Sequence, residues 1–244
     1  MSAFSNIVTI LKKELRSYFN SPLAYVLIVI FLLAAQGFAF LFGGVFERQE
    51  ASLTESFFFW HPWLFMVLAP ALGMRLWSEE QRLGTMELLL TMPVAPWHAI
   101  VGKFLAASVI IFLALALTFP IWMTISYLGK PDHGVIFAGY CASFLLGTSF
   151  LAVTSAVSAF TRSQVVAFVI AVAVCLLLIL AGFPPVVQFL NEFRFGEMVA
   201  AFGVLTHFNE LAKGILVLRD VFFFLSVTGF CLYFTAVVLK SKRA

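Results

Sequence analysis

Long apolar runs separated by short polar segments dominate the chain. Each run is close to the roughly 20 residues that a helix needs to cross a bilayer. Turn residues such as 129–132, 161–163 and the prolines at 184–185 separate several of these runs. The pattern predicts six membrane-spanning helices, over residues 22–45, 57–77, 104–128, 135–160, 164–183 and 221–239.

Composition supports the same fold class. Of the 244 residues, 62% are hydrophobic and 11% are charged, and the mean hydropathy is +1.04. Soluble domains carry roughly a quarter charged residues, so this chain lacks the polar side chains that a water-exposed surface requires. We expect an all-α membrane protein that forms one transmembrane domain over residues 1–244, with the lipid bilayer as its surroundings.

The first segment, residues 4–19, has a different pattern. Its apolar residues recur at three- and four-residue spacing, while Lys12, Lys13 and Arg16 fall on the opposite face. A basic amphipathic helix of this kind lies in the membrane interface, with its cations toward anionic head groups. Asn20, Ser21 and Pro22 end this helix, and Pro22 suits the first turn of the next one.

The segment over residues 186–219 mixes apolar and charged residues too closely for a span. Each charge at the bilayer centre would cost about 2.5–3.5 kcal/mol. We therefore expect short helices in the outer leaflet here. Arg219 and Asp220 then lie at the mouth of the last span, where Asp220 is favourable near a helix N-terminus.

Charge asymmetry predicts the orientation. With the N-terminus inside, ten Lys and Arg and four acidic residues fall on the inner side, and five basic and eight acidic residues fall outside. An excess of Lys and Arg marks cytoplasmic loops. We therefore expect both termini in the cytoplasm. The net charge of +3 is too small to indicate a nucleic-acid partner.

Several function classes lack support in the sequence. The predicted spans hold no acid or histidine at mid-membrane, which argues against an ion-coupled carrier. The four histidines and three cysteines are scattered along the chain. We therefore interpret each histidine as an isolated polar residue at the membrane interface and expect no metal site. Residues 97–103 end in Gly-Lys, but Trp97 replaces the first glycine of a phosphate-binding loop and Phe104 replaces its Ser or Thr. We expect no catalytic site and no cofactor in this chain.

The inner segment over residues 78–93 is the part that suggests a mechanism. Gly84 breaks the extension of the second span, Thr85 is a good N-cap, and Glu87 complements the dipole of the helix that follows. Leucines 88–90 supply apolar contact area, and Pro93 ends the piece. Two interpretations of this short helix remain open: it rests on the lipid interface, or it enters a groove on a cytosolic partner.

These residues resemble a known family. The run 74–93, MRLWSEEQRLGTMELLLTMP, followed by Gly102-Lys103-Phe104, is similar to the signature of ABC-2-type transporter permeases, most nearly the gliding-motility-type subgroup. Further similarities follow in the same order along the chain, at 13–15, 18–22, 158, 161–164, 207–208, 214 and 218–221. The resemblance covers nearly the whole chain.

The resemblance implies a six-span permease with an N-terminal elbow helix, a coupling helix over residues 84–92 between spans two and three, and short outer helices before span six. It implies a second permease copy or a homologue, with the solute path between the two copies, and two cytosolic ABC ATPase subunits that bind ATP and magnesium. It leans toward export. The residues implied to couple to the ATPase are Glu79, Glu80, Arg82, Gly84, Thr85, Met86, Glu87, Leu88, Leu89 and Leu90. The residues implied to be structural at the outer face are Gly214, Arg219 and Asp220.

Two alternatives remain on the sequence alone. The chain could be a non-transporting membrane anchor for an ATPase-driven envelope or motility complex, because an anchor would need the same docking helix. An ion-coupled secondary carrier is the other, and the missing mid-membrane ionisable group argues against it.

Overall fold

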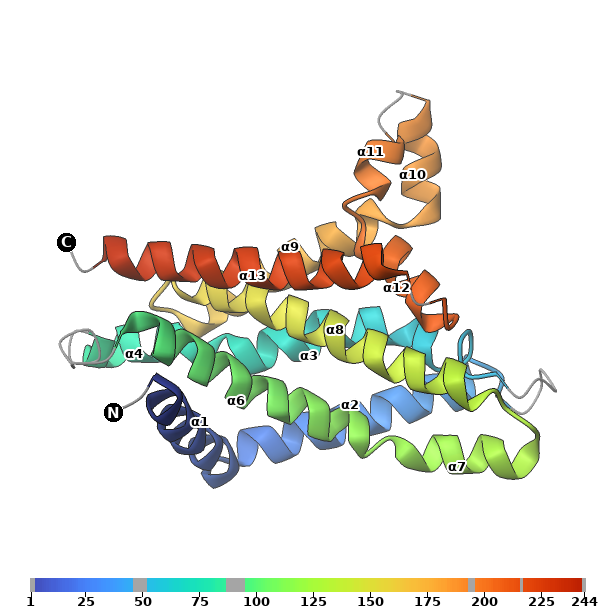
Figure 1. Cartoon of the computed structure of the whole chain (residues 1–244), viewed down its shortest axis with the longest axis horizontal. Coiled ribbons are helices and arrows are strands. Elements are labelled where there is room, and N and C mark those ends of the chain that lie inside the picture. The colour runs from blue at the N-terminus through green and yellow to red at the C-terminus, as the bar shows by residue number, and fades with distance from the viewer. Residues whose placement is uncertain (1–2, 46–51, 87–94, 193–195, 216, 243–244) are drawn as a thin grey trace.

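The computed structural model describes residues 3–45, 52–86, 95–192, 196–215 and 217–242. Within these residues every regular element is a helix (Figure 1). The elements are α1 (Ala3–Asn20), α2 (Pro22–Leu41), η1 (Phe58–Trp60), α3 (His61–Gly73), α4 (Arg75–Leu83), α6 (Pro96–Ala116), α7 (Phe119–Leu128), α8 (His133–Ser158), α9 (Gln164–Ala181), α10 (Pro184–Asn191), α11 (Gly196–Ala200), α12 (Val204–Ala212) and α13 (Leu218–Ser241).

Helix α8 lies at the centre of the bundle. It packs against α3, α6, α9, α12 and α13, and small or hydroxyl-bearing residues let its neighbours approach closely. At Gly147, an added Cβ would lie 3.0 Å from Ile111 on α6 and 3.1 Å from Phe65 on α3. Both chain termini and α4 lie at one end of the bundle, whereas α7 and α12 lie at the other (Figure 1).

Among the residues that the structure describes, five helical segments are long and apolar enough to cross a membrane. They are Pro22–Leu41, Pro96–Leu128, His133–Ser158, Gln164–Ala181 and Leu218–Ser241. The remaining predicted span, 57–77, is divided among η1, α3 and the start of α4. Helix α3 alone has 13 residues, which is roughly 20 Å at 1.5 Å per residue and short of the hydrocarbon thickness. The sixth crossing therefore stays a prediction.

The helix expected over 104–128 also differs from the structure. It begins at Pro96, in the first turn where proline is favoured, and it breaks between α6 and α7. Pro120 lies in the first turn of α7, and proline has no backbone N–H to continue the α6 hydrogen-bond ladder. The buried Thr118 hydroxyl donates to the Leu115 carbonyl at 2.6 Å, which satisfies one group at the break.

Helix α1 occupies the segment expected over 4–19 and crosses the bundle at a steep angle (Figure 1). It packs closely on α6, because a Cβ added at Gly102 would lie 2.8 Å from the Ile10 side chain. The Ser21 hydroxyl accepts from the Leu23 N–H and so caps α2. Its position in the membrane interface, as an elbow helix, remains a prediction.

The segment expected to hold short outer helices contains α10, α11 and α12. Helix α12 packs on α8 and α9, while α10 and α11 pack on each other and project from the bundle (Figure 1). Charged residues that interrupt the apolar pattern, such as Glu192 and Glu197, lie in this projection. Their position away from the bundle avoids the cost of burying a charge.

Candidate functional site at the end of helix α4

Helix α4 is amphipathic, and its two faces meet different surroundings. Leu76, Trp77 and Ser78 are buried against the bundle, whereas Arg82 and Leu83 are exposed. The helix ends at Gly84, whose φ of 71° is in the left-handed region that glycine adopts without a Cβ penalty. The chain therefore changes direction at this point, and Met86, two residues further on, is again buried.

A buried lysine connects α4 to two other helices. Lys103 of α6 is 4% exposed, and its Nζ lies 3.0 Å from Glu80 Oε1 of α4 and 3.1 Å from Glu14 Oε1 of α1. The same ammonium lies 5.6 Å from the ring centroid of Trp77. A buried charge costs several kcal/mol unless it is paired, and here two carboxylates and an aromatic face compensate it.

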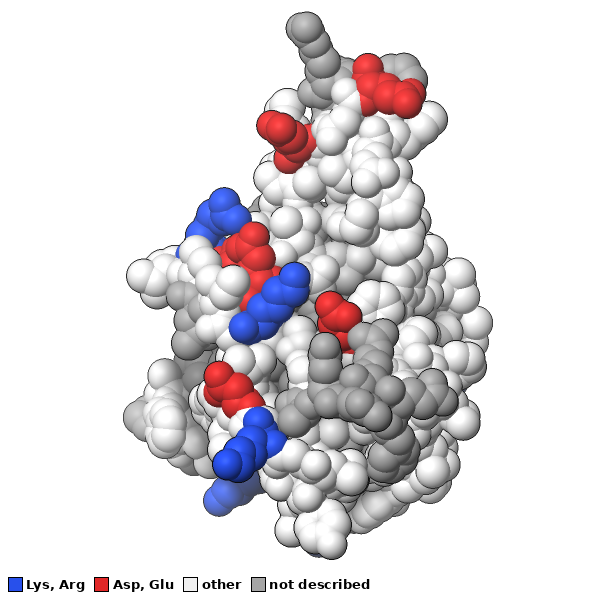
Figure 2. Space-filling model, turned by 90° about the vertical axis from the view of Figure 1, so that its right-hand side faces the viewer, with Lys and Arg blue, Asp and Glu red and all other residues white. Residues whose placement is uncertain are grey.

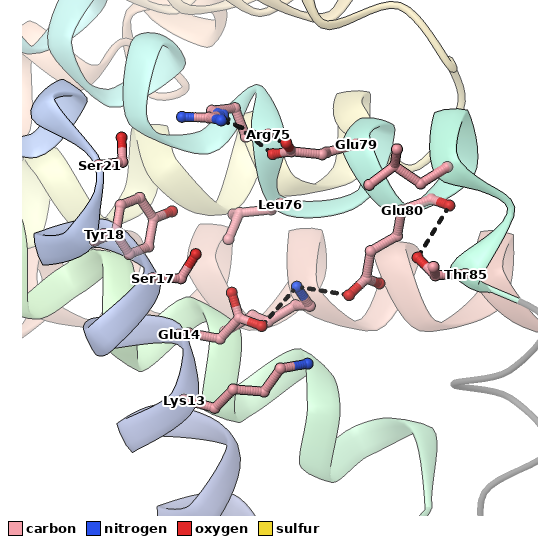
Figure 3. Close-up of a pocket in the computed structure, with 12 residues that line it drawn as sticks. Lys13, Glu14, Ser17, Tyr18, Ser21, Arg75, Leu76, Glu79, Glu80 and Thr85 are labelled. Atoms are coloured by element: carbon pink, nitrogen blue, oxygen red, sulfur yellow. Dashed lines mark hydrogen bonds and ion pairs between the residues drawn. The ribbon is translucent and has the colours of Figure 1, made fainter.

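A cavity of about 290 Å³ lies beside this ion cluster, between α1 and α4. Glu14 and Glu80 both contact the Lys103 ammonium, and Figure 3 shows these two carboxylates on different helices, with Arg75 and Glu79 on another part of the wall. Arg75 donates to both carboxylate oxygens of Glu79, at 3.1 and 3.3 Å. The charges that line the cavity are therefore largely paired with each other.

Tyr18 closes the wall of the cavity formed by α1. Its hydroxyl donates to the Leu72 carbonyl of α3 at 3.3 Å. Burial, followed by the negative charge of Glu14, raises the pKa of the Tyr18 hydroxyl. The group therefore stays protonated at physiological pH and keeps its donor proton.

A second buried contact fixes the rotation of α4. The Trp77 indole N–H donates to the Ser155 hydroxyl of α8 at 3.0 Å, and both side chains are buried. Together with the Lys103 cluster, this contact attaches α4 to α1, α6 and α8. Displacement of α4 would therefore strain three neighbours at once.

The structure distributes the predicted coupling residues unevenly. Arg82 and Thr85 are exposed, Glu79 is half-buried in its pair with Arg75, and Glu80 is held by Lys103 inside the protein. Met86 is buried, at 7% exposure. Thr85 is itself helical, and its hydroxyl lies 3.5 Å from the Glu80 carbonyl. Four of the predicted residues, Glu87, Leu88, Leu89 and Leu90, lie outside the described residues.

Of the residues predicted at the outer face, Arg219 and Asp220 lie at the start of α13, whereas Gly214 lies before it and packs against Val135 of α8. Asp220 is fully buried, and its Oδ1 lies 2.6 Å from His207 Nδ1 of α12. The other ring nitrogen of His207 lies 3.0 Å from the Ala201 carbonyl, and the ring stacks on Phe223 at 4.1 Å. Exposed Arg219 lies 3.6 Å from Asp220. Figure 2 views this end and shows acidic and basic side chains interspersed on it.

The interpretation of each histidine as an isolated polar residue at the membrane interface is wrong for two of them. His207 is buried in the pair with Asp220. His61 is fully buried among aromatic side chains, and its Nδ1 lies 2.6 Å from the Ser143 hydroxyl of α8. Neither partner is near in sequence, so local pattern carried no signal of these contacts. Within the described ranges, no three His, Cys, Asp or Glu side chains gather as a metal site.

The fold and the apolar helices define a multi-pass helical membrane protein. The chain belongs to a transporter family: a family model described as ABC-2 family transporter protein matches residues 8–242. A comparison with curated proteins found no match. Membership makes the chain a permease subunit of an ABC transporter, and it implies a partnership with an ABC ATPase. The gliding-motility-type subgroup stays a prediction.

Proposed function

We propose that this chain is the non-catalytic membrane subunit of an ABC exporter. Two separate cytosolic ATPase subunits would bind ATP and magnesium and drive movement of a substrate across the bacterial cytoplasmic membrane. A second copy of the chain, or a homologue, would complete the path for the substrate. The family match supports the general class, the site at α4 supports a connection to a cytosolic partner, and export, the copy number and the second permease rest on the resemblance of residues 74–93 to these permeases.

The observation that carries the proposal is the junction at Gly84. Helix α4 is attached to α1, α6 and α8 by buried contacts up to this residue, and its exposed side chains, Arg82 and Leu83, come directly before it. A partner that displaces the segment after Gly84 would act on a helix that is rigidly connected to the bundle. This is the property that a coupling element requires.

The site divides the predicted coupling residues into two roles. We infer that Arg82 and Thr85, which are exposed, contact the ATPase together with the segment from Glu87 to Leu90. Glu80 instead holds α4 to α6 through Lys103. A charge reversal at Glu80 would therefore damage the permease itself, whereas one at Arg82 would act on the partner contact.

Co-purification tests the proposal directly. An adjacent reading frame with a phosphate-binding-loop motif would identify the ATPase to co-express. We expect Glu87→Lys and Leu89→Asp to abolish co-purification of that ATPase with the tagged permease while membrane insertion stays intact. Lys130→Glu, in the turn at the opposite end of the bundle, is the matched control and should leave association unchanged. Unchanged co-purification after both α4-side substitutions would contradict the proposal.

Reconstitution separates the exporter from the non-transporting anchor. Both would bind an ATPase, but in an exporter the ATP hydrolysis rate of the reconstituted complex should respond to a candidate solute. Transport without any ATPase subunit, driven by an imposed proton gradient, would instead indicate an ion-coupled carrier.

A further inference from the structure

The last turn of the chain meets α4 at a small polar cluster, which we call the C-terminal joint. It consists of Gln81 of α4, Lys242 after α13, and the backbone carbonyls of Ser158, Ala159 and Phe160 at the end of α8. The Lys242 ammonium donates to Gln81 Oε1 at 2.6 Å and to the Phe160 carbonyl at 3.2 Å. The Gln81 amide donates to Ala159 at 2.8 Å and approaches Ser158 at 3.4 Å. Three helices therefore meet at one side chain.

The chemistry of the joint follows from the end of α8. The last carbonyls of a helix have no partner within the helix, and the negative end of the helix dipole attracts cations. Gln81 donates to these carbonyls through its amide nitrogen and accepts from Lys242 through its amide oxygen, so it bridges α8 and α13. A leucine could do neither, and an aspartate or glutamate could not donate to the carbonyls.

Consecutive residues of α4 are thus attached in two directions. Glu80 pairs with Lys103 of α6, which in turn pairs with Glu14 of α1. Gln81 is bonded to the end of α8 and to Lys242. The two attachments share no residue apart from the backbone of α4, so each can be removed without the other.

We propose that the C-terminal joint makes the last span follow the movement of α4. A displacement of the segment after Gly84 then reaches α13 through Gln81 and Lys242, in addition to its path to α6 through Lys103. Gln81 and Lys242 are positioning residues in this scheme. The inference rests on the proposed function, in which an ATPase displaces that segment.

Lys240 shows that the contact is specific to Lys242. Both lysines lie at the end of the same helix and both are exposed, but Lys240 makes no hydrogen bond or ion pair with the part of the chain that the structure describes, whereas Lys242 makes two hydrogen bonds. If the joint only capped the end of α8, its removal would loosen α8. The distance between α4 and α13 would then stay unchanged. That distance therefore distinguishes the two roles.

The test measures that distance by pulsed electron paramagnetic resonance. Spin labels replace exposed Leu83 on α4 and exposed Lys240 on α13, in a full chain whose Cys141, Cys175 and Cys231 are changed to Ser. The permease–ATPase complex is examined with and without ATP. With Gln81 and Lys242 intact, we expect a narrow distance distribution at the same position in both states.

Two variants remove the joint, and one keeps half of it. Gln81→Leu and Lys242→Met should each broaden the distribution of distances between the two spin labels and make it shift with ATP. The ATPase should still co-purify with either variant, but the permease should no longer stimulate its ATP hydrolysis. Gln81→Glu keeps the attraction to Lys242 and loses donation to α8, so its distribution should stay narrow. Lys12→Met, which removes an exposed cation from α1, is the control and should match the wild type.

The inference would be overturned if the distance distributions of Gln81→Leu and Lys242→Met matched that of the wild type both with and without ATP. Failure of the proposed function gives a different result. If no ATPase binds the wild-type permease, ATP leaves every distribution unchanged, but the joint still predicts a narrow distribution for the wild type and a broad one for the two variants. Equal widths without nucleotide would overturn the joint by itself.

Discussion

Lys103 Nζ lies 3.0 Å from Glu80 Oε1, and this ion pair joins α6 to α4 at the end of the bundle that holds both termini. Glu14 approaches the same ammonium from α1 at 3.1 Å. The two carboxylates come from segments that the sequence separates widely. Their convergence on one buried cation joins α1 and α4 into a single unit, and this can be tested by substitution.

Lys103→Met should destabilise the protein strongly. It leaves Glu14 and Glu80 without their cation, and removal of one partner from a buried pair costs about 3–5 kcal/mol. Changing the two carboxylates to Gln in the same chain should restore much of the loss, because no uncompensated charge remains. Thermal unfolding of the purified protein in detergent measures both effects. A triple variant no more stable than Lys103→Met would contradict this account of the cluster.

The outer pair predicts a contrast between a buried and an exposed partner of Asp220. His207→Leu leaves a fully buried carboxylate without its 2.6 Å partner, so we expect a loss of about 3–5 kcal/mol in unfolding free energy. Arg219→Ala removes an exposed partner at 3.6 Å and should change stability by about 1 kcal/mol or less. Equal melting temperatures for the two variants would show that burial of the partner does not decide how much each contact with Asp220 contributes to stability.

Two glycines with positive φ predict different costs for alanine. Gly84→Ala meets no atom within 4 Å of the new Cβ, so only the left-handed backbone opposes it, at about 1–2 kcal/mol. Gly214→Ala has a φ of 82° and also places its Cβ 3.1 Å from Val135, so it should cost more. Gly37→Ala, in the interior of α2 with open space around it, is the control and should stabilise the helix by about 0.5–1 kcal/mol. Unfolding curves of the three variants give this order or refute it.

Labelling of single cysteines tests the orientation. In a chain without its natural cysteines, Arg82→Cys and Lys240→Cys should react with a membrane-impermeant maleimide from the cytoplasmic side, and Lys130→Cys from the opposite side. All three positions are exposed, whereas Met86 is buried and would report poorly. If Arg82→Cys reacted only from outside the cell, the orientation would be the opposite of the expected one. The proposed contact with a cytosolic ATPase would then be excluded.

Hydrophobic pattern alone was enough for much of the fold. The long apolar runs identify the helices, because lipid-facing segments must satisfy their backbone groups internally. The amphipathic pattern of α1 identifies which of its faces is polar, and the left-handed Gly84 ends α4 as the break in the sequence predicts. The run around Gly84 also carries the resemblance to the family that the chain belongs to.

The breaks within the spans were less accessible to the sequence. Pro70 lies inside α3, and Pro120 lies after the break between α6 and α7, yet the surrounding residues are apolar throughout. A continuous apolar run predicts a span but not where the helix within it stops. The short α3 and the early start of α6 at Pro96 are therefore findings of the structure.

By itself, the sequence determined that the chain is a helical membrane protein whose second apolar run ends in a polar segment broken at Gly84, since hydropathy and local breaks depend only on neighbouring residues. The tertiary structure decided which polar side chains meet: Lys103 with Glu14 and Glu80, His207 with Asp220, and Gln81 with Lys242. A helix that is apolar on all sides gives no signal of which face turns inward. Only the packing of one helix on another sets that rotation, and with it the partner of each buried charge.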